Sequence, residues 1–207
     1  MSYSEQRAAQ TAAFFISRAG GTIEILKLMK LMYLAERESL ARYGEPIIGD
    51  VLVSMKHGPV LSRTLDHING FIDSEEGGWE SWVSAKAGLQ LGLQPAHDPA
   101  QLTQLSDADM EILDFIWDKF GQYSKYKLRD VTHKICQEWE DPGDTSQLIP
   151  YSRVLNCVGY KPEVVRELEQ RIQDEEELGK MFSLAPGDRP NDFPDGNYSA
   201  ISQQWCS

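Results

Sequence analysis

His57 stands where enzymes often place a catalytic histidine, after an apolar run and before a Gly-Pro break in the stretch DVLVSMKHGPVLS. As a general base it would need a partner side chain, a pocket and donors for developing negative charge. No nucleophile motif accompanies it, and Pro59 has no N–H to offer a phosphate. A structural role is therefore favoured: Lys56 and His57 end a strand, and Gly58 adopts a φ that other residues resist.

His133 and Cys136 form a second candidate site, because residues three apart share one face of a helix. Zinc usually takes four ligands, so Cys157 and His67 would have to complete such a site, although no spacing requires it. A core cysteine beside a semi-exposed histidine is the simpler interpretation. We therefore expect no metal and no cofactor.

Two lysines, Lys27 and Lys30, interrupt the otherwise apolar stretch LKLMKLMYL. A lysine on such a helix either extends its ammonium group to water or pairs with an acid. Glu24 and Glu36 are near enough along the helix to be the acids. The apolar face itself is expected to be core.

The charge of the chain indicates the kind of partner it would accept. The net charge is −12 and the pI is about 4.8, so the chain repels phosphate backbones and nucleic acid is a poor candidate. A basic protein suits this charge better. The acidic runs at 75–76 and 175–177 are interpreted as solvated charges in a loop and at a helix end.

The location is predicted to be cytoplasmic, with no contact with a membrane. No apolar run approaches the ~18 residues of a membrane span, and the N-terminus has neither the basic start nor the apolar stretch of a signal peptide. The three cysteines are widely spaced, which favours a reducing compartment over a disulfide framework.

The hydrophobic patterns predict a mainly helical, bundle-like domain with a small central antiparallel sheet of about three short strands. Ser4, Thr22 and Ser124 are placed to cap helices. Ser106 with Asp109 resembles a capping box. The predicted helices span about 4–18, 22–42, 61–71, 106–120, 124–139, 151–158 and 162–179.

Strands are predicted at 51–55, where alternation and β-branching favour them, and at 79–86 and 88–95, with a hairpin turn near Gly88. Together they would make the sheet. Gly58 and Pro59 are expected to stop the first strand, and Pro59 with Val60 to enter the next helix.

Three parts are expected along the chain: a domain over 1–160, an amphipathic helix over 161–182 and an irregular or disordered tail over 183–207. The tail ends in ISQQWCS, where Ile201 and Trp205 would lie one helical turn apart. An exposed tryptophan lowers solubility, so this end is interpreted as a docking element.

Three motifs in fixed order resemble the Panacea domain, also called the SocA-like antitoxin domain and the phage-associated GepA-like family. They are LKLMKLMYLA at 26–35, YGEPIIGD at 43–50 and MKHGPV at 55–60, and the resemblance extends over about 5–160. Glu36 and Met32 depart from the usual Asp and Leu. The motif residues are Leu26, Lys27, Lys30, Tyr33, Tyr43, Gly44, Pro46, Gly49, Asp50 and, in a later Thr-His element, His133.

The resemblance implies an antitoxin of a bacterial or prophage toxin–antitoxin pair, without enzymatic activity. Such a protein would neutralise its cognate toxin, expected from the adjacent gene, by binding it directly. Some family members carry a separate DNA-binding domain, for which no room is expected before Ser4. The residues predicted to contact the partner are Lys56, His57, Gly58, Pro59, Trp139 and Trp205.

Two functions of other classes stay open at this point. One is an adaptor that delivers a partner protein to a protease, which the charged tail would serve. The other is a small hydrolase or metal enzyme that uses His57 or His133. The oligomeric state is open as well, and a homo-oligomer is compatible with the sequence.

Overall fold

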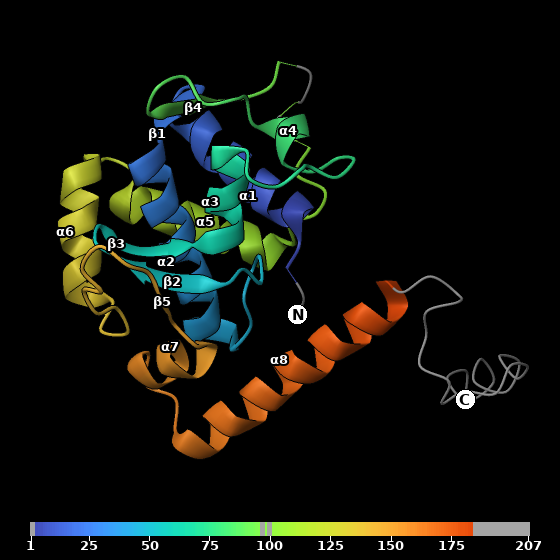
Figure 1. The fold of residues 1–207 in the computed structure, drawn as a ribbon, viewed down its shortest axis with the longest axis vertical. Helices are drawn as coiled ribbons and strands as arrows, with labels where there is room; N and C mark the ends of the chain where they lie inside the picture. Colours follow the sequence, from blue (N-terminus) through green and yellow to red (C-terminus); the bar gives the residue numbers. More distant parts are fainter. Residues whose placement is uncertain (1–2, 96–97, 99–100, 184–207) are drawn as a thin grey trace, which may run out of the picture.

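The computed structural model describes residues 3–95, 98 and 101–183, which form eight helices and five short strands. The predicted class, mainly helical with a small antiparallel sheet, is confirmed (Figure 1). In chain order the elements are α1 (Glu5–Arg18), β1 (Thr22–Glu24), α2 (Ile25–Tyr43), β2 (Leu52–Met55), β3 (Gly58–Leu61), α3 (Ser62–Asn69), α4 (Trp79–Trp82), β4 (Gln90–Gly92), α5 (Asp107–Phe120), α6 (Lys125–Ile135), β5 (Gln147–Leu148), α7 (Tyr151–Cys157) and α8 (Pro162–Ser183).

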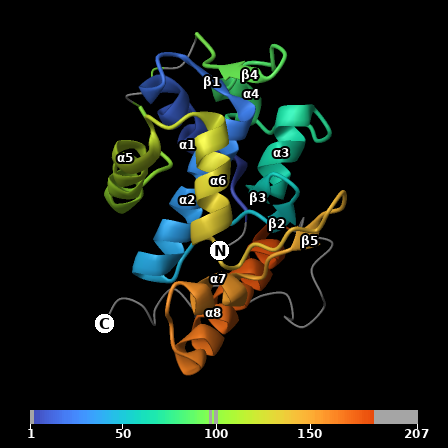
Figure 2. The same cartoon turned by 90° about the vertical axis from the view of Figure 1, so that its left-hand side faces the viewer.

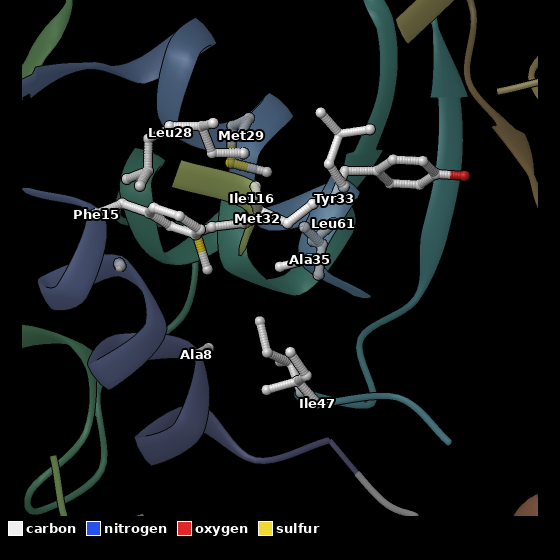
Figure 3. Close-up of a cluster of buried hydrophobic side chains, with 14 of the residues drawn as sticks. Ala8, Phe15, Leu28, Met29, Met32, Tyr33, Ala35, Ile47, Leu61 and Ile116 are labelled. Carbon is white, nitrogen blue, oxygen red and sulfur yellow. The ribbon is translucent and has the colours of Figure 1, made fainter. Parts of the chain in front are cut away.

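Helix α2 is the centre of the fold. Every residue from Leu28 to Glu36 is buried, and α2 contacts α1, α5, α6, α7 and β3. Figure 3 shows Phe15 of α1 and Ile116 of α5 in the same apolar cluster as Met32 of α2. A helix that is apolar around most of its circumference is stable only when neighbours cover it on most sides.

Three predicted helix starts are confirmed. The side chains of Ser4 and Ser124 accept hydrogen bonds from backbone N–H groups of the first turns of α1 and α6. Ser106 and Asp109 form both hydrogen bonds of a capping box at α5. The prediction for Thr22 is wrong, because residues 22–24 form strand β1 and α2 begins only at Ile25.

The strands pair differently from the prediction. The described residues contain two sheets, one with β1 antiparallel to β4 and one with the order β3-β2-β5. The strand predicted at 79–86 is wrong, because residues 79–82 form the short helix α4. Its buried Trp79 and Trp82 are three residues apart, which is the spacing of one helix face. The turn near Gly88 is confirmed by the paired Ala87 and Gln90.

The sequence suggested that Gly58 and Pro59 stop the strand and lead into a helix, but they do not end the sheet. They begin β3, which pairs with β2 across a tight turn made by Lys56 and His57. β3 is an edge strand, where a proline without an N–H group is tolerated. The next helix therefore starts at Ser62 and is not entered by Pro59 and Val60.

Helix α8 lies along the outside of the described structure next to α7 (Figures 1 and 2). Its buried side chains include Val165 and Ile172, and Arg171 forms an ion pair with Glu45 at 2.7 Å. The division of the chain at residue 160 stays a prediction. Trp205 and the predicted tail lie outside the described residues, apart from Ser183 at the end of α8. No helix in the described part of the chain has the length and apolarity to cross a membrane.

Candidate functional site

Three motif segments meet around the side chain of Lys30. Helix α6 runs beside α2 (Figure 2) and also contacts β3, so Lys30, Gly58 and His133 come together from three elements. Lys30 is fully buried, and its Nζ donates a hydrogen bond to the carbonyl oxygen of Pro59 at 2.7 Å. A Cβ atom on residue 58 would lie 2.9 Å from Lys30 Nζ and 3.1 Å from His133 Nε2, so Gly58 allows this close approach.

His133 is held by an aromatic stack. Its ring lies 4.0 Å from the ring of Trp139 with an angle of 4° between the planes, and Trp139 Nε1 donates to the carbonyl oxygen of Met55 at 2.9 Å. Nε2 of His133 is buried and has no hydrogen-bond partner among the described residues. Burial and the neighbouring Lys30 lower the pKa of His133, so the imidazole is neutral at pH 7.

The expectation that Lys30 extends to water or pairs with Glu24 or Glu36 is wrong. Glu24 pairs with Lys125, and no carboxylate in the described part of the chain forms an ion pair with Lys30. Burial therefore lowers the pKa of Lys30 to about 7.

Lys30→Met is expected to weaken the pH dependence of stability between about pH 7.5 and 9. The pKa of Lys30 falls from 10.5 to about 7 on folding, so the unfolded state binds more protons in this range. The free energy of unfolding of the wild type then rises with pH by up to about 1.4 kcal/mol per unit. Methionine binds no proton, so the slope should fall by about that amount in urea unfolding curves. An unchanged slope would contradict the lowered pKa.

A buried acid connects α2 to the segment that follows α6. Glu138 is fully buried, and its Oε1 accepts hydrogen bonds from Tyr33 Oη at 3.0 Å and Arg37 Nε at 2.9 Å. Burial and the charge of Glu138 raise the pKa of the Cys136 thiol. The thiol is therefore protonated and is not an activated nucleophile.

The loop between α2 and β2 is organised by two more buried acids. Glu36 accepts hydrogen bonds from the N–H groups of Ile47, Ile48 and Gly49 at 2.8 to 3.2 Å. Asp50 accepts from the first turn of α3, including the N–H and hydroxyl groups of Thr64. Burial raises the pKa of both carboxyls, that of Glu36 to about 7, although the hydrogen bonds lower it in part. Both acids are structural.

The other motif residues lie in α2, at its end or in the loop that follows it. Lys27 Nζ donates to the carbonyl oxygen of Gly121 at 2.6 Å and lies 5.6 Å from the centre of the Trp117 ring. These residues line an open groove of about 370 Å³. Gly44 ends α2 with a positive φ of 70°. Leu26 is half-buried, Tyr43 is exposed, Pro46 is buried, and Gly49 has a φ of 75°.

The residues predicted to contact a partner differ in how exposed they are. Lys56 and His57 are exposed in the turn between β2 and β3, where Lys56 forms an ion pair with Asp144 at 2.7 Å. Gly58 and Pro59 are buried beneath that turn, and Trp139 is half-buried. The hairpin turn and Trp139 therefore stay a predicted contact surface.

The hypothetical zinc site is not assembled. Among the described residues, no three His, Cys, Asp or Glu side chains form a group that would hold a metal. His67 lies in another cluster, where its ring stacks between Tyr3 and Trp79 and its Nε2 is 3.6 Å from a carboxylate oxygen of Glu5. Sequence reasoning missed Glu5, because nothing in α1 distinguishes this acid from a solvated one.

The comparisons with known proteins gave one match. The model of a family described as antitoxin SocA-like, Panacea domain, matches residues 28–140. No curated protein and no solved structure matches the chain. The matched range contains most of α2, both strands of the hairpin and α6, which together surround Lys30.

Proposed function

Because the chain belongs to the SocA-like antitoxin family with a Panacea domain, whose model matches more than half of its length, we propose that it neutralises a toxin by binding the toxin protein directly. The family match carries this proposal. It implies a toxin as partner, and we propose that the adjacent gene encodes it. We propose no enzymatic activity for this chain.

Three buried polar residues in or next to the motifs support a binding function over catalysis. Lys30, Glu36 and Asp50 are buried and hydrogen-bonded to backbone groups. A catalytic acid or base must instead reach a substrate. These three buried residues therefore stabilise the fold, and we infer that the partner binds at the surface.

The charge of the chain favours a basic toxin. At a net charge of −12 the protein attracts a basic partner and increases the rate of encounter. A standard interface would bury about 800 Å² on each partner. The sequence predicts Lys56 and His57 as contacts of such an interface, and both are exposed in the hairpin turn.

Co-expression with the protein encoded next to it tests the proposal. The neighbour alone is expected to arrest growth, and growth should return when the present chain is co-expressed. The two proteins should then co-purify at a fixed stoichiometry. A harmless neighbour, or a toxic one that this chain neither binds nor neutralises, would contradict the proposal. A neighbour that is degraded faster in the presence of this chain would instead indicate a protease adaptor.

A further inference from the structure

The loop between α3 and α4 exposes two large apolar side chains side by side. Phe71 is 76% exposed, more than any other large hydrophobic residue in the described part of the chain, and Ile72 is 39% exposed. Both views show this connection at the periphery of the molecule (Figures 1 and 2). Neither residue belongs to the core, so the fold does not explain why apolar residues stand here.

The same loop is held in one conformation by the buried Glu5. Oε1 of this carboxylate accepts hydrogen bonds from the hydroxyl of Ser74 at 2.5 Å and the N–H of Trp79 at 2.6 Å. Oε2 accepts from the N–H of Glu75 at 3.1 Å. Burial opposes the charged form of Glu5, but these hydrogen bonds and the nearby His67 outweigh it and lower the pKa.

Backbone contacts fix both ends of the loop as well. The N–H of Phe71 donates to the carbonyl of Asp66 at 2.9 Å, and the N–H of Gly78 donates to the carbonyl of Glu75 at 2.9 Å. A loop that is ordered before it meets a partner loses less conformational entropy on binding. The exposed aromatic ring is thus presented on a preorganised support.

Three acidic side chains without an ion-pair partner among the described residues follow the apolar pair. Asp73, Glu75 and Glu76 are exposed, and none of them forms an ion pair with another described residue. This arrangement has the anatomy of an interface, with an aromatic residue at the centre and charged residues at the rim. Because a second copy of this chain would bring the same acids together, the charge disfavours self-association through this loop.

We propose that loop 71–76 docks the toxin, and that the complementary surface is an apolar pocket ringed by lysine or arginine. Phe71 would fill the pocket, and Asp73, Glu75 and Glu76 would face the basic rim. This inference rests on the proposed function. It assigns the docking surface to this loop in place of the hairpin turn of Lys56 and His57.

The test uses the full chain co-expressed and purified with the protein encoded next to it. Phe71→Ala is expected to weaken the complex at least tenfold in a titration, without changing the melting temperature by more than about a degree, because Phe71 is outside the core. The double variant Glu75→Gln, Glu76→Gln should slow association and reduce its dependence on salt. Leu148→Ala is the matched control, since Leu148 is 58% exposed on β5, and it should bind like the wild type.

The outcomes separate the two proposals. A wild-type chain that neither binds nor neutralises the neighbour contradicts the proposed function and this inference with it. A wild-type chain that binds, together with a Phe71→Ala variant that binds equally well, overturns the docking surface alone. Loss of binding in Leu148→Ala but not in Phe71→Ala would move the interface to the side of the hairpin. A dimer of the wild-type chain that Phe71→Ala dissociates would identify a second copy as the occupant.

Discussion

Glu36→Ala is expected to lower the free energy of unfolding by about 3–5 kcal/mol. The Glu36 carboxylate accepts hydrogen bonds from three consecutive N–H groups in the loop before β2, and both the acid and the loop are buried. Each buried donor left without a partner costs about 1–3 kcal/mol. Alanine offers no acceptor, and it leaves a cavity beside the central helix.

Glu38→Ala is the control for this variant. Glu38 lies on the same helix two residues later, but it is paired with Arg42 at the surface, and such pairs contribute about 0.5 kcal/mol or less. Urea unfolding of both variants measures the difference. Losses within about 1 kcal/mol of each other would show that Glu36 does not organise the loop.

Gly58→Ala is expected to cost about 2–4 kcal/mol, through two separate effects. Gly58 has a φ of 98°, which strains any residue with a Cβ atom. The added carbon would also meet Lys30 Nζ at 2.9 Å and His133 Nε2 at 3.1 Å. The methyl group has to displace the hydrogen-bonded lysine or the stacked imidazole, and both are confined by their neighbours.

Gly21→Ala separates backbone strain from steric contact. Gly21 has a φ of 97°, but no heavy atom beyond its two chain neighbours lies within 4 Å of its Cβ position. This variant should therefore show the strain alone, about 1–2 kcal/mol. Equal losses for the two glycine variants would mean that contacts of the added methyl group with Lys30 and His133 contribute nothing to the loss at residue 58.

His57→Ala should lose less than about 0.5 kcal/mol in the same unfolding measurement, because His57 is exposed.

The helices were predictable because their signals are local. Ser4, Ser124 and the pair Ser106 and Asp109 cap the helices that the sequence assigns to them. A cap and the apolar period that follows it lie within a few residues of each other, so no knowledge of the rest of the chain is needed.

Strand pairing was not predictable, because it depends on distant residues. Thr22 has the chemistry of a helix cap, but β1 pairs with β4 almost 70 residues away, with Thr22 opposite Gly92. This pairing overrides the local signal at the start of α2. Trp79 and Trp82 have high strand propensity, and their packing against α1 makes them helical instead.

The candidate site was predictable in its members but not in its geometry. The motifs contain Lys30, Gly58 and His133, and the positive φ of Gly58 was expected from its place beside the turn. No spacing in the sequence indicates that these three residues meet, because they come from three elements. His57 itself is exposed in a turn, one residue before the glycine that lets the buried groups approach.

The central position of α2 has a consequence for synthesis on the ribosome. The partner of Tyr33 in the interior, Glu138, is 105 residues further along the chain. At 5–20 residues per second, translation takes about 5–20 s to reach it. During that interval the central helix of the fold lacks its later neighbours, and a nascent chain in this state is a natural client for chaperones. Under conditions that slow translation, the supply of folded protein should therefore fall by more than the supply of completed chains.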